Sequence, residues 1–239
     1  MTYLLSVKKL TKRFQGLVAN EDITFSVAEG EIRSVIGPNG AGKTTFISMI
    51  SGHLRPTEGR IFFRGADITS LKVQERARLG IIRKFQTPSV FLGLTARANI
   101  ELAVIAAGTP RGQRQGRIDE VLDLVRMTAF ADREASILSH GQRQWLEIGL
   151  LLGAKAQLLL LDEPTAGMTT EETHATGTLI RDLTHRLRLS AIIIEHDINF
   201  IRDLQAPITV LHLGKVFCEG SFEEVSSDAH VRNIYLGNE

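Results

Sequence analysis

A glycine-rich loop followed by lysine and two threonines is the stretch of this sequence whose chemistry is clearest. Residues 37–45 read Gly-Pro-Asn-Gly-Ala-Gly-Lys-Thr-Thr, which fits the phosphate-binding pattern of two glycines with four residues between them, then Lys and Ser or Thr. Glycines let such a loop curl round phosphate oxygens with its N–H groups pointing inward. The sequence therefore predicts a nucleoside triphosphate site with contacts from Gly37, Pro38, Asn39, Gly40, Ala41, Gly42, Lys43, Thr44 and Thr45.

The residues on either side of the loop have the pattern that this motif requires. Residues 32–36 are a β-branched, apolar run, and apolar residues recur at helical spacing after residue 45, so the loop joins a strand to a helix whose positive end faces the anion. Lys43 is expected to reach the β and γ phosphates and Thr44 to place its hydroxyl on Mg²⁺. Thr45 is available to a phosphate oxygen nearer the sugar.

Two adjacent acids follow the most apolar strand of the chain. Residues 158–161 are four leucines, as expected for a strand buried on both faces, and Asp162 and Glu163 come next, at the carboxyl end where open α/β sheets bind ligands. We expect Asp162 to bind Mg²⁺ directly or through water. Glu163 is expected to orient and deprotonate a water that attacks the γ-phosphate.

Three further residues have weaker signals when each is taken alone. Phe14 precedes the phosphate loop and can stack on a base, although an ordinary core position explains it equally well. Gln86 ends a predicted strand over residues 81–85 and can hold Mg²⁺ or the attacking water. His196 follows a buried strand over residues 191–194 and can donate a hydrogen bond to the γ-phosphate, or be structural.

Together these elements resemble the ATP-binding subunit of an ABC transporter over residues 4–237. The motif order carries the resemblance: the loop at 37–45 resembles Walker A, Gln86 the Q-loop, residues 139–142 the signature motif, residues 158–162 Walker B, and His196 the switch histidine. The resemblance implies an ATPase that binds ATP and Mg²⁺, with Gln86 as a metal contact and Glu163, His196 and Gln86 as catalytic residues.

The resemblance also implies the fold, an α/β P-loop NTPase built as a single ABC ATPase domain over residues 1–239. A central, mostly parallel sheet and an N-terminal antiparallel β part would come from residues 1–86 and 157–239, which form the RecA-like core. Residues 87–156 would form a helical part. Short strands at residues 4–7 and 23–27, separated by turn residues that include Asn20, indicate the antiparallel part.

In that family two chains stack head to tail, so the resemblance assigns Ser139, Gly141 and Gln142 to the partner's ATP. The helix that begins near Gly141 points its N-terminus at the γ-phosphate across the interface. Two positions depart from the usual pattern: His140 replaces a glycine of the signature, and Thr169 replaces an aspartate in the loop after Walker B. We expect the His140 side chain to point away from the phosphate.

Within the family, three stretches look most like the urea and short-amide importers, a branch of the branched-chain amino acid importer group. They are residues 82–88, 139–147 and 166–169, and the ending over 214–216 and 235–237 fits the larger group. The resemblance implies membrane permeases, a second ATPase that is identical or related, and a solute-binding protein as partners. The exposed apolar run expected at 87–92 is predicted to receive a permease helix.

Composition and charge bear on which other functions and locations the sequence allows. The 28 Lys and Arg balance 27 Asp and Glu, which gives no long-range attraction to nucleic acid. One cysteine and no apolar run near the roughly 20 residues of a membrane span favour a protein that stays in the cytoplasm. The resemblance to transporter subunits implies that it sits peripherally on the cytoplasmic face of the inner membrane. Branched-chain amino acids remain an alternative cargo. A soluble ABC ATPase acting on DNA or ribosomes and a subunit that binds ATP without turnover are more distant alternatives.

Overall fold

The computed structural model of the protein describes residues 3–84 and 90–236, without the side chains of 234–236. Gln86 and residues 87–89 of the predicted permease-binding run therefore lie outside the described residues. Within the described ranges, no helix is long and apolar enough to cross a membrane.

Four strands form an antiparallel sheet in the order β2-β1-β4-β5. They are β1 (Tyr3–Phe14), β2 (Leu17–Ala28), β4 (Glu58–Phe63) and β5 (Ala66–Asp67). The pairing confirms the antiparallel N-terminal part. β1 and β2 are much longer than expected, because Asn20 lies inside β2, fully buried, and not in a turn.

A second sheet has six strands in the order β10-β9-β3-β8-β7-β6, parallel from β9 to β6, with β10 antiparallel at one edge. They are β3 (Ile32–Ile36), β6 (Ile81–Arg83), β7 (Leu158–Asp162), β8 (Ser190–Ile194), β9 (Ile208–His212) and β10 (Lys215–Gly220). All five residues of β7 are buried, which confirms the predicted central strand and the mostly parallel sheet.

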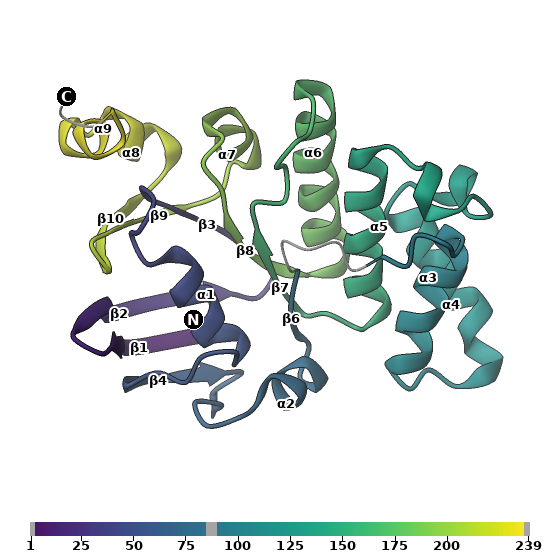
Figure 1. Ribbon diagram of the computed structural model, residues 1–239, viewed down its shortest axis with the longest axis horizontal. Coiled ribbons are helices and arrows are strands. Elements are labelled where there is room, and N and C mark those ends of the chain that lie inside the picture. The colour runs from purple at the N-terminus through teal and green to yellow at the C-terminus, as the bar shows by residue number, and fades with distance from the viewer. Residues whose placement is uncertain (1–2, 85–89, 237–239) are drawn as a thin grey trace.

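The helices lie between and beside these two sheets (Figure 1). They are α1 (Lys43–Ser51), α2 (Val73–Arg78), α3 (Ala96–Ala106), α4 (Arg111–Leu124), α5 (His140–Gly153), α6 (Thr170–Leu187), α7 (Ile198–Leu204), α8 (Phe222–Ser227) and α9 (Ala229–Leu236). α3, α4 and α5 pack together at one end, away from the antiparallel sheet. The subdivision at residues 86/87 and 156/157 stays a prediction.

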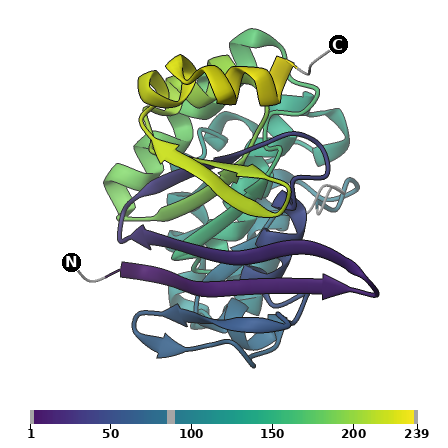
Figure 2. The same ribbon diagram turned by 90° about the vertical axis from the view of Figure 1, so that its left-hand side faces the viewer.

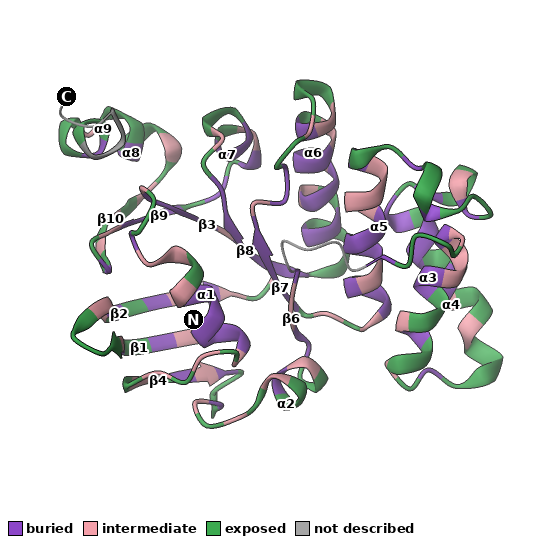
Figure 3. Cartoon of the chain, in the orientation of Figure 1, coloured by how far each residue is buried: buried purple, intermediate pink, exposed green. Residues whose placement is uncertain are grey.

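Alternate residues of the central strands face two different cores. Leu158 and Leu160 of β7 pack with α1 and the antiparallel sheet, whereas Leu159 and Leu161 pack with the helices on the opposite face. This alternation follows from the two-residue period of a strand. α1 is thereby held between the two sheets, and its second half, Phe46–Ser51, is buried (Figure 3).

Two contacts between the sheets position the phosphate loop. The β1–β2 hairpin passes beside β10 in Figure 2, and Glu21 N–H donates to the Gly214 carbonyl at 2.8 Å. In turn Gly214 N–H donates to the Ala41 carbonyl at 3.1 Å. The loop after β3 is therefore held from the antiparallel sheet through the turn between β9 and β10.

Candidate nucleotide site

The phosphate loop runs from the end of β3 to the start of α1, as the sequence predicts. Gly42 has φ of 96°, and a Cβ there would lie 2.4 Å from the Ala19 carbonyl oxygen of β2. Asn20 Nδ2 donates to the Gly42 carbonyl at 3.3 Å. Only glycine meets both the left-handed conformation and this close approach, so β2 determines the path of the loop where α1 begins.

Lys43 lies across the loop. Its Nζ donates to the carbonyls of Gly37 at 2.5 Å and Pro38 at 3.0 Å. Burial lowers the pKa of Lys43 below its usual value, against the opposing effect of the Glu163 and Asp162 carboxylates. The ammonium is thus partly desolvated and held where an added anion would stabilise its charged form.

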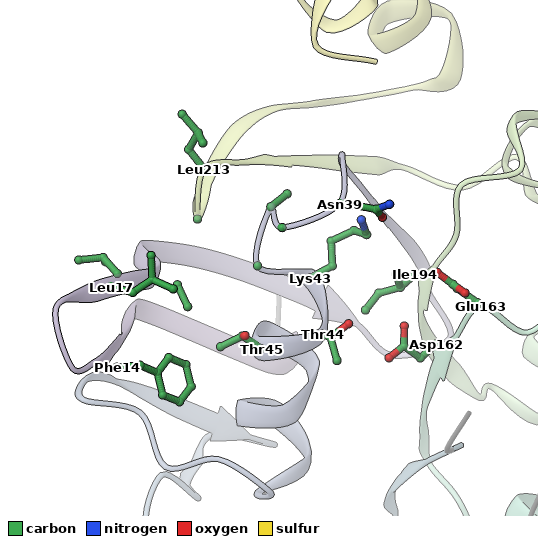
Figure 4. A pocket seen from close by; sticks show the side chains of 16 residues that line it. Phe14, Leu17, Asn39, Lys43, Thr44, Thr45, Asp162, Glu163, Ile194 and Leu213 are labelled. Carbon is green, nitrogen blue, oxygen red and sulfur yellow. The ribbon is translucent and has the colours of Figure 1, made fainter. Parts of the chain in front are cut away.

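A cavity of about 540 Å³ opens in front of the loop (Figure 4). Phe14 and Leu17 lie at one end of it, and Asp162 and Glu163 lie at the other. Its lining residues are Phe14, Leu17, Val18, Ala19, Asn39, Gly40, Ala41, Gly42, Lys43, Thr44, Thr45, Asp162, Glu163, Ile194, Leu213 and Gly214. An apolar end and a phosphate-binding end match the two halves of a nucleotide. The Phe14 ring, 39% exposed, is available for stacking.

Asp162 ends β7 beside this cavity. The carboxylate is buried, and its Oδ2 accepts from Arg83 Nη2 of β6 at 2.9 Å, while Arg83 Nη1 donates to Ser48 Oγ of α1 at 2.7 Å. Thr44 and Asp162 lie near one another in Figure 4. A hydroxyl and a carboxylate are suitable ligands for Mg²⁺, which takes one or two carboxylates plus phosphate oxygens.

A Mg²⁺ ion bound by Thr44 and Asp162 would need phosphate oxygens as further ligands. Across residues 3–84 and 90–236, no group of three or more His, Cys, Asp or Glu side chains could hold a metal ion. The donors present therefore fit a Mg²⁺ that arrives with a nucleotide rather than a metal held by protein ligands alone.

Glu163 and His196 meet at the carboxyl ends of β7 and β8. His196 Nδ1 lies 3.8 Å from Glu163 Oε1, although the residues are far apart in the sequence. Glu163 has φ of 50°, an uncommon conformation for a residue with a side chain that concentrates at functional sites. The parallel neighbours β7 and β8 therefore deliver a candidate base and a candidate hydrogen-bond donor to one place.

A buried carboxylate behind them was not anticipated from the sequence. Glu195 accepts from Thr165 N–H at 3.0 Å and from Thr165 Oγ1 at 2.6 Å through one oxygen, and from His196 N–H at 3.1 Å through the other. It ties the loop after Glu163 to the end of β8. Its position directly before His196 was the only signal in the sequence.

The signature residues begin α5 and do not line the cavity. Ser139 is the N-cap: its Oγ accepts from Gln142 N–H at 3.2 Å, and Gln142 Oε1 accepts from Ser139 N–H at 2.9 Å. Gly141 N–H is also at this helix start and donates to Glu172 of α6. A single chain therefore does not bring Ser139, Gly141 and Gln142 together with the phosphate loop.

The His140 side chain points into the loop after β7, as expected for a group that avoids a phosphate. Its Nε2 donates to the Ala166 carbonyl at 2.9 Å. Thr169 in the same loop caps α6, its Oγ1 accepting from Glu172 N–H at 3.2 Å. His140 thus joins the start of α5 to the loop that leads into α6, and Thr169 caps α6 itself.

The chain is similar in sequence to several known proteins. Residues 20–166 match the family model described as ABC transporter. The chain is 36% identical over 239 residues to the lipopolysaccharide export system ATP-binding protein LptB of Acidithiobacillus ferridurans, covering 100% of this chain and 99% of that protein. It is 34% identical over 249 residues to the high-affinity branched-chain amino acid transport ATP-binding protein BraF of Pseudomonas aeruginosa, covering 98% of each.

A solved structure gives the same result for the fold. The crystal structure of the ADP conformation of MJ1267, an ATP-binding cassette of an ABC transporter, superposes with a TM-score of 0.89 at 28% identity and covers 100% of both chains. The α/β P-loop NTPase fold is confirmed.

Proposed function

Because the chain belongs to the ABC transporter family, as an ATP-binding and ATP-hydrolysing subunit, we propose that it powers a membrane importer whose cargo is urea or a short amide. Members of this family bind ATP with Mg²⁺, work with membrane permeases and dimerise, so the predicted cofactors are confirmed. The observation that carries the nucleotide role is the cavity in which the phosphate loop, Asp162 and Glu163 meet.

In this proposal each lining group has a distinct task in binding. Residues 37–45 surround the phosphates, Lys43 contacts the β and γ phosphates, and Phe14 stacks on the base. Thr44 and Asp162 hold Mg²⁺ together with Gln86. When bound, Mg²⁺ neutralises charge on the phosphates.

Hydrolysis is assigned to the pair at the ends of β7 and β8. Glu163 takes the proton of the attacking water, and His196 donates a hydrogen bond to the γ-phosphate. Their separation of 3.8 Å allows both to serve one reaction centre. Ser139, Gly141 and Gln142 would complete the site on a second ATPase subunit, because they lie outside this chain's own cavity.

The permease contact is proposed around Phe91. Its backbone is held on both sides by the buried Asn99: Phe91 N–H donates to Asn99 Oδ1 at 2.8 Å, and Asn99 Nδ2 donates to the Phe91 carbonyl at 3.0 Å. The ring is 60% exposed and Leu92 47%. An apolar group presented on an anchored backbone is suited to docking, here with a permease at the cytoplasmic face of the inner membrane.

The urea or short-amide cargo rests on the three stretches at 82–88, 139–147 and 166–169. In the structure two contacts link these stretches in pairs: Lys84 lies 3.1 Å from Glu147, and His140 donates to the Ala166 carbonyl. The stretches that resemble the urea and short-amide importers thus contact one another. This linkage supports treating them as a single feature of the chain.

Two other transport roles have specific support. Similarity to BraF favours branched-chain amino acids as cargo, and similarity to LptB favours a subunit of an exporter. Both would use the nucleotide site described above in the same way, since an ATPase subunit does not contact the cargo.

Co-purification with the tagged chain from gently solubilised membranes of its native cell tests these roles. Two permeases with a second ATPase would support the importer, and their associated solute-binding protein should then bind radiolabelled urea or acetamide more tightly than leucine. Tighter binding of leucine by that solute-binding protein would instead favour branched-chain amino acids as the cargo. Recovery of lipopolysaccharide-handling partners would indicate an exporter, and recovery of nucleic acid or ribosomes without permeases would overturn the transport role.

A further inference from the structure

The starts of α5 and α6 are joined by one carboxylate. Glu172, in the first turn of α6, accepts through Oε1 from Ser139 Oγ at 3.1 Å and from Gly141 N–H at 3.2 Å. Its other oxygen accepts from Thr169 N–H at 3.2 Å. The contact with Gly141 is close enough that a Cβ there would lie 2.7 Å from Oε1.

The carboxylate is stabilised as an anion in this position. The hydrogen bond from Thr169 N–H, followed by those from Ser139 and Gly141, lowers the pKa of Glu172 despite partial burial, and nearby His140 acts in the same direction. Glu172 also lies at the N-terminal end of α5, where the helix dipole favours negative charge. The start of α5 therefore already binds an anion within a single chain.

A γ-phosphate would need the same donors. The proposed function assigns the Ser139 hydroxyl and the Gly141 N–H to the ATP held by a second subunit, and each of these groups offers one hydrogen. A carboxylate and a phosphate are both negative acceptors, so they repel each other and cannot both be bound well by the same two hydrogens.

We propose that the Glu172 carboxylate competes with the γ-phosphate for the Ser139 hydroxyl and the Gly141 N–H of the signature motif. Glu172 must therefore leave Ser139 and Gly141 before the ATP of a second subunit can bind there. This inference rests on the proposed function. The Glu172 side chain can remain bonded to Thr169 N–H while it rotates away, since that contact uses the other oxygen. Glu172 thus opposes closure of the ATP-bound dimer while holding the isolated subunit's signature motif in order.

ATP-dependent dimerisation tests the proposal. The parent is Glu163→Gln, chosen because slowed hydrolysis should leave ATP bound. Its dimer dissociation constant is measured by sedimentation with saturating Mg-ATP, alone and with added Glu172→Gln or Glu172→Ala. Glutamine keeps a side chain accepted at this position of a capping box. Glu171→Gln is the matched control, because it removes a neighbouring exposed acid from the same first turn of α6.

Loss of the competing charge should tighten the dimer by about tenfold per signature site. A symmetric dimer has two such sites, so the dissociation constant should fall about 100-fold for Glu172→Gln and at least as far for Glu172→Ala. Glu171→Gln should leave it unchanged. Thermal unfolding of each monomer confirms that the variants are folded.

The outcomes separate the inference from the function on which it rests. A purely structural Glu172 would make the dimer weaker or leave it unchanged when replaced, and either result in folded protein overturns the proposal. Binding of a fluorescent ATP analogue to the monomeric parent is measured in parallel. Absence of that binding would refute the nucleotide site itself, and the competitor with it.

Discussion

Removing the buried cation Lys84 should destabilise the protein strongly. Lys84 follows β6, its Nζ lies 3.1 Å from Glu147 Oε2 of α5, and both side chains are only 4% exposed. Lys84→Met would leave the Glu147 carboxylate buried without this cation. Breaking a buried pair from one side costs about 3–5 kcal/mol, which corresponds to a fall of about 6–20 °C in Tm for a chain of this size.

Replacing both partners together should restore most of the loss. In Lys84→Met/Glu147→Leu two apolar side chains of similar volume fill the site, and such replacements of buried pairs are often neutral or stabilising. We expect the double variant to lie within about 1–2 kcal/mol of the parent. The interaction energy from the double-mutant cycle would then exceed about 2 kcal/mol.

Urea unfolding of the four proteins, followed by circular dichroism, measures these free energies if one cooperative transition is seen. Lys215→Met is the matched control. Lys215 pairs with Glu21 at the same 3.1 Å, but the side chains are 61% and 41% exposed, so its loss should cost about 0–1 kcal/mol. The reasoning is refuted if Lys84→Met costs no more than this control, or if the two single losses simply add in the double variant.

Three further variants test the nucleotide site. Glu163→Gln should reduce ATP hydrolysis by about 10²–10⁴-fold with ATP binding retained in an equilibrium assay; normal turnover would remove Glu163 from the role of base. Gly42→Ala should reduce the stability by about 1–3 kcal/mol through backbone strain, and further because the new Cβ would lie 2.4 Å from the Ala19 carbonyl oxygen. The variant should also lose nucleotide binding, and an unchanged melting curve would contradict this prediction. Lys43→Met should abolish ATP binding without lowering the Tm of the nucleotide-free protein. Burial disfavours the Lys43 ammonium and lowers its pKa in the fold, so below that pKa the charge opposes folding and its removal should cost no stability. A fall of several degrees in Tm would refute this.

Local patterns were reliable where neighbouring residues alone decide the conformation. The phosphate loop is continuous in sequence, and residues 158–161 and 191–194 are uninterrupted apolar runs, so the type and place of these elements were predictable. Asn20 was misjudged as a turn residue because a polar side chain in β2 is explained only by its contact with Gly42. Similarly, the charged residues of α2 are typical of a surface helix, yet Arg76 is buried and donates to the carbonyls of Met49 and Ile50.

The sequence by itself determined the chemistry available to this protein: which residues surround phosphate, which acids follow a buried strand, and near which residue α5 begins. These depend on covalent neighbours and on short-range hydrogen bonds. Only the tertiary structure decided which distant groups meet, because strand order and register depend on packing over the whole chain. Parallel pairing of β7 with β8 brings His196 to Glu163, and the approach of α6 to α5 places Glu172 on the signature motif.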